Sequence, residues 1–467
     1  MPEVRTWQLA AGAAVVGLAL AAGAVAAAGP WDSGQRKAEK RWAAAQGRAG
    51  EAHHQPEAPK RPAPAPSAPG VLIALGTPAT ASATPPAKAP DGLKKVLAPL
   101  LDDPALGPVR TACVVDVTTG ARLYGRGAET PMTPASTVKI ATAAAALTAL
   151  GPDHRIPTTV VAAADAEKIT LVGGGDATLD RVGLTRLADR TARALRDRGV
   201  TTVRLTYDTS LYEGPLVHPI GPNGNIAPVS ALMVGQGRRN PKSTGDAART
   251  DDPAGEAATL FEQLLAERGV RTSADPAHGR PVPKAVPLAQ VLSLPVSAVV
   301  ERMLTTSDND IAESLARQTA VATGEKAHFA GAGRAVAAQL RRLELPLEGA
   351  RFADGSGLNR GDKVSAALLT ALLAKAGDPN HPELRPILTG LPVAGFTGTL
   401  EDRYANSPAG TGLVRAKTGT LSGVDTLAGT VVTADGRLLA FAFLAGDTAS
   451  RDVARPALDR LAAALVP

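Results

Sequence analysis

Apolar and polar positions alternate with a strand period in two distant parts of the chain, and both parts predict β-hairpins. Residues 108–129 contain two strand-like runs joined by Thr-Thr-Gly, and residues 426–447 contain two more, with an Asp-Gly turn at 435–436. A hairpin alone is marginally stable in water. We therefore expect the two hairpins, about three hundred residues apart, to join in one antiparallel sheet flanked by helices.

Three segments close to these hairpins follow the helical period instead. Residues 91–107 form an amphipathic pattern, residues 136–150 form an alanine-rich helix that ends at Gly151, and residues 450–466 form a third helix with Pro456 near its start. Together with the sheet, they predict an α/β fold of the α+β type.

The region between the hairpins has a different texture, in which short strands alternate with helices and long loops from 156 to 287. This pattern predicts an inserted α/β domain that interrupts a core domain made of 91–155 and 288–467. No fixed repeat is visible, which excludes a solenoid.

The first 90 residues do not resemble a folded domain. An uncharged run from about Leu9 to Ala28 follows Arg5 and is on the order of the 20 residues that span a bilayer. Residues 1–30 thus predict an export signal: the length favours an uncleaved membrane anchor, although the small residues of "AVAAAG" also fit a cleaved signal peptide. Residues 31–90 are basic and then rich in Pro and Ala, which predicts a disordered linker.

Composition narrows the function classes. Of the 467 residues, 44% are hydrophobic but only 3% are aromatic, so the core must consist of Ala, Val and Leu. The single cysteine, Cys113, cannot form a disulfide within the chain and is expected to be a buried strand thiol. The formal charge of +6 is concentrated after the apolar run, and no nucleic-acid-binding motif with interleaved aromatics occurs, so we predict no nucleic-acid partner.

No metal or cofactor is predicted either. The seven histidines are scattered, and no H-E-x-x-H or Cys/His cluster occurs. The glycine-rich stretch "VGGGD" at 172–176 lacks the Gly-Lys-Ser/Thr of a phosphate loop and is better explained as a turn.

Ser136 and Lys139 form the first candidate for chemistry. Their i, i+3 spacing places both side chains on one helix face, with Cβ atoms about 5 to 6 Å apart. A serine becomes a nucleophile when a base takes its proton, and a lysine can be that base once burial lowers its pKa. The apolar helix provides such a setting, and a helix N-terminus also offers a backbone N–H to an oxyanion.

Two further motifs strengthen this hypothesis. Ser307–Asp308–Asn309 stands at the start of an amphipathic helix, and Lys417–Thr418–Gly419–Thr420 lies in strand-like sequence just before the last hairpin. Each has an ordinary structural explanation, as a helix N-cap and as a strand end with a turn glycine. Three such elements in this order, each at a helix start or an edge strand, are hard to assign to chance.

On these motifs, S-x-x-K, S-D-N and K-T-G, the sequence resembles the penicillin-recognising serine acyl enzymes. It is most similar to low-molecular-mass penicillin-binding proteins that act as D-alanyl-D-alanine carboxypeptidases and endopeptidases and carry an insertion after the nucleophile helix. The segments "LVGGGDATL" at 171–179, "APVSAL" at 227–232, "DGSGLNR" at 354–360 and "AKTGTLSGV" at 416–424 carry that closer resemblance. It extends over about 91–467 and implies a β-lactamase/transpeptidase-like core.

The resemblance implies a role for each motif residue. Ser136 would be the nucleophile and Lys139 its general base. Ser307 would relay a proton to the leaving amine, and Asn309 would bind the peptide amide of the substrate.

For the K-T-G-T motif, the resemblance implies that the charge of Lys417 lowers the pKa of Lys139 and attracts the terminal carboxylate of the substrate. Thr418, Gly419 and Thr420 would bind substrate: the two hydroxyls would contact the carboxylate, and the Thr420 N–H would complete an oxyanion hole with Ser136. The strand edge would pair with an extended peptide.

The resulting hypothesis is an exported enzyme, tethered to the membrane or secreted to the cell wall. It would act on peptidoglycan stem peptides through an acyl-serine, would be acylated by β-lactams, and needs no cofactor. Cleavage of cross-links stays open as a second activity.

A catalytically silent wall-binding scaffold and a β-lactamase are the alternatives. The segment between Ser136 and Ser307 is longer than the corresponding segment of a β-lactamase, and no glutamate matches the deacylating one of class A enzymes. The insertion is shorter than is usual in the carboxypeptidase subgroup, so we expect one reduced domain.

Overall fold

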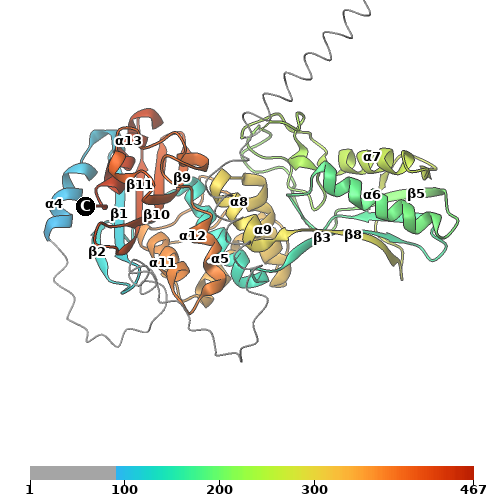
Figure 1. Ribbon diagram of the computed structural model, residues 1–467, viewed down its shortest axis with the longest axis horizontal. Helices are drawn as coiled ribbons and strands as arrows, with labels where there is room; N and C mark the ends of the chain where they lie inside the picture. The colour runs from blue at the N-terminus through green and yellow to red at the C-terminus, as the bar shows by residue number, and fades with distance from the viewer. Residues whose placement is uncertain (1–90, 244) are drawn as a thin grey trace, which may run out of the picture. The chain divides into compact units, whose positions relative to one another are not determined.

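The structure is a computed structural model that describes residues 91–243 and 245–467 (Figure 1). The predicted export segment, 1–30, and the predicted linker, 31–90, lie outside the described residues. Within the part that is described, no helix has both the length and the apolar character needed to cross a bilayer.

The predicted antiparallel sheet is confirmed, and it joins both hairpins. Its strand order is β2-β1-β11-β10-β9, and β1 pairs with β11 along its whole length, with Cys113 opposite Ala442. The order places β9, which carries the K-T-G-T motif, at the end of the sheet. The strands are β1 (Val109–Asp116), β2 (Arg122–Arg126), β9 (Val414–Leu421), β10 (Val424–Val432) and β11 (Leu438–Gly446).

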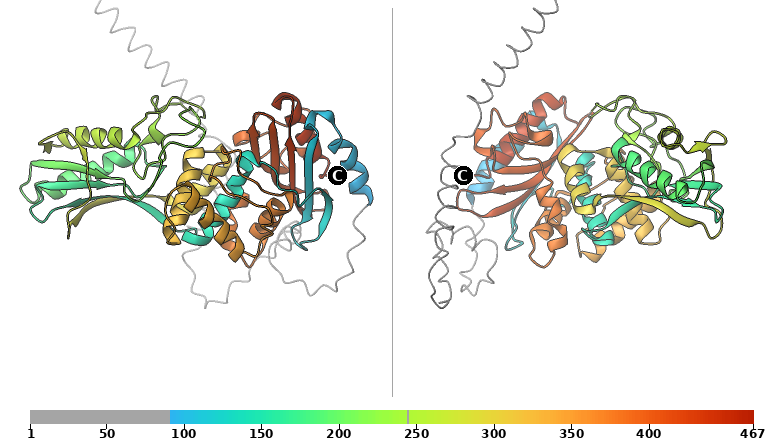
Figure 2. Two further views of the ribbon diagram at one scale, coloured as in Figure 1. Left: turned by 180° about the vertical axis from the view of Figure 1, so that it is seen from behind. Right: turned by 45° about the vertical axis from the view of Figure 1, so that its right-hand side comes forward.

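Helices cover both faces of this sheet because alternate strand residues are apolar on each side (Figures 1 and 2). On β11, Phe441 and Phe443 pack in one core with α4 and α13, whereas Ala440, Ala442 and Leu444 belong to a second core with the remaining helices. The first face is covered by α4 (Asp91–Leu101) and α13 (Arg451–Ala463), and the second core includes α5 (Lys139–Leu150), α8 (Val296–Thr306), α9 (Asn309–Ala322), α10 (Phe329–Arg342), α11 (Ala366–Gly377) and α12 (Pro386–Thr389).

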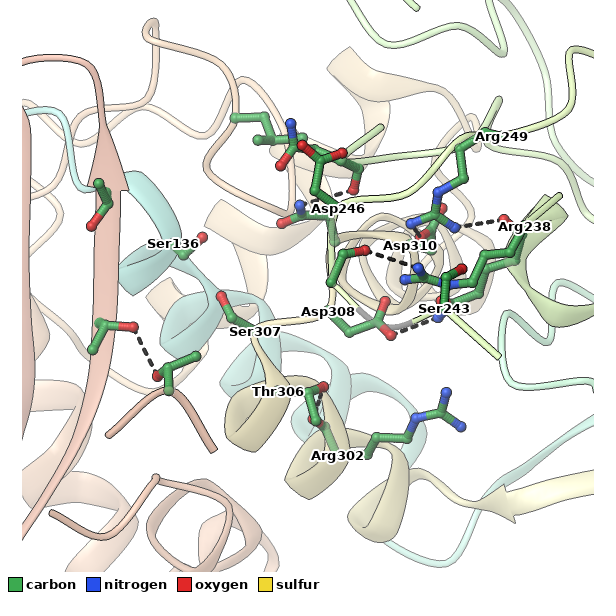
Figure 3. Close-up of a pocket in the computed structure, with 18 of the residues that line it drawn as sticks. Ser136, Arg238, Ser243, Asp246, Arg249, Arg302, Thr306, Ser307, Asp308 and Asp310 are labelled. Atoms are coloured by element: carbon green, nitrogen blue, oxygen red, sulfur yellow. Dashed lines mark hydrogen bonds and ion pairs between the residues drawn. The ribbon is translucent and has the colours of Figure 1, made fainter. Parts of the chain in front are cut away.

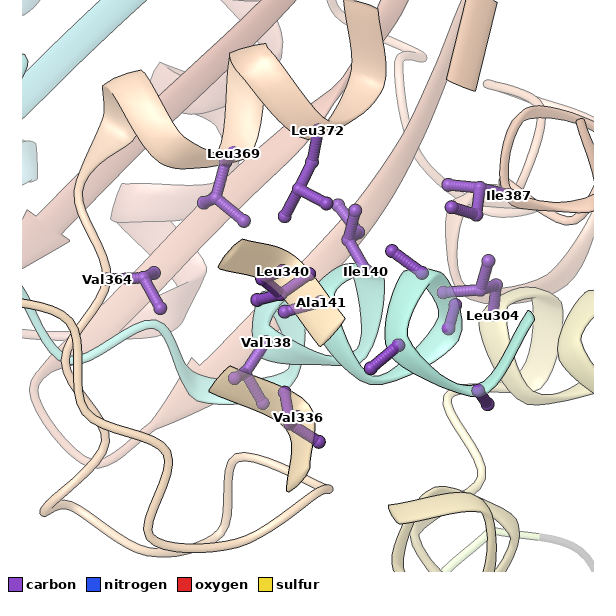
Figure 4. Packing of buried hydrophobic residues seen from close by; sticks show 14 of the residues in the cluster. Val138, Ile140, Ala141, Leu304, Val336, Leu340, Val364, Leu369, Leu372 and Ile387 are labelled. Atoms are coloured by element: carbon purple, nitrogen blue, oxygen red, sulfur yellow. The ribbon is translucent and has the colours of Figure 1, made fainter. Parts of the chain in front are cut away.

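The alanine-rich helix α5 lies at the centre of the second core (Figure 4). Every residue from Lys139 to Leu147 is buried. Its small side chains allow α8, α9, α10 and α11 to approach it, and large residues of those helices, such as Leu340 and Leu372, fill the space around it. A lysine at the start of this helix is therefore surrounded by apolar material.

A second sheet is built from the chain between α5 and α8. Its order is β6-β5-β4-β3-β8, with β7 also paired to β5, and it contains both parallel and antiparallel pairs. The strands are β3 (Arg155–Ala162), β4 (Lys168–Val172), β5 (Thr202–Asp208), β6 (Arg271–Thr272), β7 (Ala277–His278) and β8 (Val286–Pro295), with α6 (Arg181–Arg196) and α7 (Pro253–Ala266) between them.

The chain enters the second sheet on β3 and leaves it on β8, and these two strands pair with each other. Because β8 runs to Pro295, the predicted limit of the inserted domain at 287 falls inside a strand. The domain boundaries themselves stay a prediction.

Candidate active site

Ser136 lies on a tight turn rather than in the first turn of an α-helix. It belongs to a 3-10 segment, Ala135–Val138, that runs directly into α5. Ala135 has a φ of 47°, in the left-handed region that a residue with a side chain rarely adopts. This local strain aims the Ser136 side chain into a cleft, where it is partly exposed.

Two glycines allow other segments to approach this turn closely. A Cβ on Gly357 would lie 2.0 Å from the Ala135 oxygen, and a Cβ on Gly419 would lie 3.1 Å from the Ser136 nitrogen and 2.6 Å from the Pro134 oxygen. Neither position therefore has room for a side chain. The glycine of the K-T-G-T motif is needed for β9 to lie against the turn that carries Ser136.

Lys139 is fully buried beneath Ser136. Its Nζ donates to Ser136 Oγ at 3.0 Å, to Asn309 Oδ1 at 2.7 Å and to the Ser356 carbonyl at 2.6 Å. Burial lowers the pKa of Lys139 to about 8, although the carboxylates of Asp354 and other acidic residues nearby act in the opposite direction. With this pKa, about a tenth of the amine is neutral at pH 7, far more than for an ordinary lysine.

A second buried amine lies on the other side of the cleft. Lys417 Nζ donates to Ser307 Oγ at 2.8 Å and to the Thr418 carbonyl at 2.9 Å. Ser307 ends α8 in the left-handed conformation, with a φ of 59°, which turns its hydroxyl toward β9. Burial and the charge of Lys139 lower the pKa of Lys417 well below its ordinary value.

The S-D-N motif contacts a long segment of the insertion, the described residues 223–243 and 245–250, which we call the inserted loop. Asn309 Nδ2 donates to the Asn225 carbonyl at 3.0 Å. Gln236 Nε2 donates to Asp308 Oδ2 at 2.6 Å, while Asp308 Oδ1 caps α9. The amide oxygen of Asn309 is thereby left to face Lys139.

A buried ion pair adds to this attachment (Figure 3). Asp310, the residue after the motif, accepts from Arg249 Nη2 at 3.0 Å and from the Ala227 N–H at 2.9 Å, and both charged side chains are almost inaccessible. Burial raises the pKa of Asp310 to about 7, against the opposing effect of Arg249. The inserted loop thus contacts all three residues that follow Ser307.

The "DGSG" turn supports Lys139 from below. Both oxygens of Asp354 accept two donors each: the Ser356 and Gly357 N–H groups on Oδ1, and the Asn359 N–H and His218 Nε2 on Oδ2. This ring of donors fixes the turn that presents the Ser356 carbonyl to Lys139. Side-chain contacts with Asp354, above all the hydrogen bond from His218, lower its pKa to about 2 against the effect of burial.

The polar groups surround a cleft of about 530 Å³. Ser136, Ser307, Asn309, Thr418 and Thr420 all line it, as do Arg302, Arg403 and Arg455. The cleft is therefore an open, largely polar groove that connects Ser136 with the terminal strand of the sheet.

Comparison with known proteins shows the family to which the chain belongs. The model of the D-Ala-D-Ala carboxypeptidase 3 (S13) family matches residues 93–248 and 239–465. The chain belongs to the S13 family. Its membership confirms the predicted fold class and the predicted class of enzyme, a D-Ala-D-Ala carboxypeptidase.

Curated relatives and a solved structure agree with the S13 assignment. The chain is 36% identical to carboxypeptidase DacB of Mycolicibacterium smegmatis over 87% of this chain and 89% of the relative. It is 31% identical to a D-alanyl-D-alanine carboxypeptidase of Actinomadura sp. (strain R39) over 74% of this chain and 79% of the relative. The crystal structure of penicillin binding protein 4 (dacB) from Haemophilus influenzae has the same fold, with a TM-score of 0.66 at 21% identity over 80% of this chain and 97% of the other.

The motif residues of this S13 carboxypeptidase come together as one site. The structure joins Ser136, Lys139 and Asn309 by hydrogen bonds, and Lys417 with Ser307. One detail differs from the implied roles: burial is the main cause of the lowered pKa of Lys139, and the repulsion between the two amines acts on Lys417.

Sequence analysis did not find the supporting residues. His218, Gln236 and Arg249 come from loops of the insertion without periodicity, and only their contacts mark them. The "DGSGLNR" stretch was a visible signal, because a buried Asp before Gly-Ser-Gly is typical of a side chain that organises its own turn. Ser356 itself is fully buried, so its hydroxyl is not a second nucleophile.

His218, Glu313 and Asp354 form a buried group of possible metal ligands. Their ligand atoms lie within 4.8 Å of one another, the one such group among the residues the structure describes. All four acceptor positions of Asp354 are already used, and Glu313 Oε1 accepts the Gly355 and Ser356 N–H groups. Glu313 Oε2 is buried without a hydrogen-bond partner, but Asp354 has no acceptor position left for a metal ion, so these residues fit a hydrogen-bonded turn better than a metal site.

Proposed function

We propose that this chain is an exported D-Ala-D-Ala carboxypeptidase in which Ser136 is acylated by the stem peptides of peptidoglycan. One observation carries the proposal: a fully buried amine, Lys139 Nζ, lies 3.0 Å from the Ser136 hydroxyl oxygen. A buried amine with a lowered pKa beside a hydroxyl is the arrangement that nucleophilic catalysis requires.

In the acylation step, Ser136 Oγ attacks the carbonyl carbon of the penultimate D-Ala while Lys139 accepts its proton. The Oγ–C bond forms, the C–N bond to the terminal D-Ala breaks, and the proton that Lys139 took from Ser136 passes through Ser307 to the leaving amine, which leaves Lys139 neutral again. The N–H groups of Ser136 and Thr420 stabilise the oxyanion. Water then hydrolyses the ester in a second step and releases the shortened peptide.

The two amines divide the work through their charges. Two buried ammonium groups so close together are unfavourable, so one of them is preferentially neutral. A substrate carboxylate beside β9 favours the charged form of Lys417, and the charge on Lys417 in turn favours the neutral form of Lys139. Substrate binding would then prepare the base for its reaction.

Asn309 connects substrate binding to the base. Its amide oxygen accepts from Lys139, and its amide nitrogen donates to the carbonyl of Asn225 in the inserted loop. In the proposed complex, Asn309 also contacts the peptide amide of the substrate. Thr418, Gly419 and Thr420 bind the substrate along the edge of β9.

A fluorescent penicillin tests the nucleophile. The full-length protein should be labelled covalently, and Ser136→Ala should not be labelled. Ser243→Ala is the matched control, because Ser243 also lines the cleft but its hydroxyl donates only to the Asn240 carbonyl. Equal labelling of the wild type and Ser136→Ala would refute the assignment.

Product analysis tests the substrate. Purified muropeptides incubated with the full chain should lose one alanine from pentapeptide stems, as measured by mass spectrometry. Separation of cross-linked dimers would add endopeptidase activity to the proposal. Labelling by penicillin without any change in muropeptides would contradict the proposed reaction.

We also propose that residues 1–30 direct export and that the apolar run 9–28 holds the enzyme at the outer side of the membrane. Cell fractionation and the mass of the N-terminal peptide distinguish an uncleaved anchor from a cleaved signal peptide. An intact N-terminus in the membrane fraction supports the anchor. A shortened chain in the soluble fraction would refute it in favour of a cleaved signal.

A further inference from the structure

Arg455 is a half-buried arginine at the end of the cleft where the substrate carboxylate would bind. It projects from α13, on the opposite face of the sheet from α5, and lines the same cleft as Thr418 and Thr420. Its Nη2 is 3.5 Å from Thr420 Oγ1, a long contact that uses one of five guanidinium donors. Among the described residues, no other acceptor is hydrogen-bonded to this guanidinium.

Neighbouring arginines are paired, and Arg455 is not. Arg403 binds both oxygens of Asp459, and Arg460 binds Asp103. Across the described residues, 91–243 and 245–467, no carboxylate lies within ion-pair distance of Arg455. Burial, with the charges of Arg403 and Arg451, lowers its pKa, while the charges of Asp425 and Asp452 act in the opposite direction.

The hydroxyl groups expected to bind the carboxylate have acceptors of their own. Thr418 Oγ1 donates to Thr399 Oγ1 at 2.9 Å, and Thr420 Oγ1 donates to Asp425 Oδ1 at 3.3 Å. Lys417 is hydrogen-bonded to Ser307 and to a backbone carbonyl. Each of these donors therefore already has an acceptor within the protein. A carboxylate bound at β9 would need a further donor, and Arg455 can provide it.

We propose that Arg455 binds the terminal carboxylate of the substrate directly, beside Thr418 and Thr420, and so selects peptides with a free C-terminus. The inference rests on the proposed function and adds a residue that none of the three motifs contains. A planar guanidinium matches the two oxygens of a carboxylate and stays charged at every pH of interest. Arg403 supports the position, because its Nη2 donates to the Arg455 carbonyl at 3.2 Å.

A pair of substrates that differ only at the C-terminus tests this role. An acylated peptide ending in D-Ala-D-Ala is compared with the same peptide ending in the carboxamide. Arg455→Ala should lower kcat/KM for the free acid roughly 10- to 100-fold, mainly through a higher KM, because a charge-assisted contact is lost in the ground and transition states alike. The carboxamide should change by less than about twofold, since it has no charge to bind.

Two further variants separate binding from folding. Arg455→Lys should recover part of the preference for the free acid, because lysine keeps the positive charge but lacks the planar guanidinium that can donate to both carboxylate oxygens. Arg451→Ala removes an exposed arginine one turn earlier in α13 and should leave both substrates unaffected. An equal loss for acid and amide in Arg455→Ala, or no loss for the acid, would overturn the proposal.

A second readout does not depend on peptide turnover. Benzylpenicillin carries a carboxylate, and its methyl ester does not, so the rate of acylation of Ser136 by each compound reports the same contact. Arg455→Ala should slow acylation by the acid and not by the ester. If the wild type is acylated but releases no D-Ala, the proposed function fails while this comparison still decides the role of Arg455; equal rates for the variant and the wild type with the acid would refute it.

Discussion

Acylation of Ser136 should follow the protonation state of Lys139, and the structure gives the expected pH dependence. Burial lowers the pKa of Lys139 to about 8, and only the neutral amine can accept the serine proton. The neutral fraction is then about 9% at pH 7, about 50% at pH 8 and about 90% at pH 9. The second-order rate constant for penicillin acylation should therefore rise about fivefold from pH 7 to pH 8 and less than twofold from pH 8 to pH 9.

The assay is the initial rate of fluorescent penicillin labelling at constant ionic strength, with protein stability checked at each pH. Asp308→Asn provides a matched test, because the Asp308 charge raises the pKa of Lys139 and the amide can still cap α9. The inflection should move to lower pH, by less than about one unit, since Asp308 is partly exposed to solvent. A rate that is flat between pH 6.5 and 8.5, or an inflection near the ordinary lysine pKa of about 10.4, would refute Lys139 as the base.

Three other substitutions test the supporting structure. Gly419→Ala should slow penicillin labelling at least about tenfold and lower the melting temperature, because the new Cβ would overlap the backbone of the turn that carries Ser136. Unchanged labelling would contradict this close approach. Arg249→Met should lower the free energy of unfolding, measured by urea denaturation, by about 3 kcal/mol at pH 8. The loss should be smaller at pH 6, because Asp310, with its pKa of about 7, is then largely neutral. A loss independent of pH would be evidence against the ion pair. His218→Phe removes a partner of the buried Asp354 and should also cost about 3 kcal/mol, so an unchanged unfolding midpoint would show that the His218 contact is dispensable.

Sequence patterns predicted the candidate site residues that belong to short local motifs. Ser136 and Lys139 are three residues apart, so their spacing predicts that both side chains share one face, and the structure places Lys139 Nζ 3.0 Å from Ser136 Oγ. The two hairpins were predicted because turn residues and alternation are also local signals, and their union in one sheet follows from the need to bury both faces.

Contacts between loops could not be predicted in this way. Arg249 and Asp310 are separated by α7, three strands and α8, and nothing in the periodicity of either segment pairs them. The same holds for His218 and Asp354, which lie 136 residues apart. Arg455 reads as one more polar position on an amphipathic helix, and its exposure to the cleft depends on how α13 packs against the sheet.

Lys139, the proposed base, donates to Ser136 on its own turn and also to Asn309 and Ser356, which lie 170 and 217 residues later in the chain. A chain that is still being synthesised therefore has the serine long before it has the environment that makes the serine reactive. Until β9 and the last helix have folded, we expect Ser136 of the nascent chain to react neither with penicillin nor with peptide. Penicillin would then acylate only fully synthesised and folded chains.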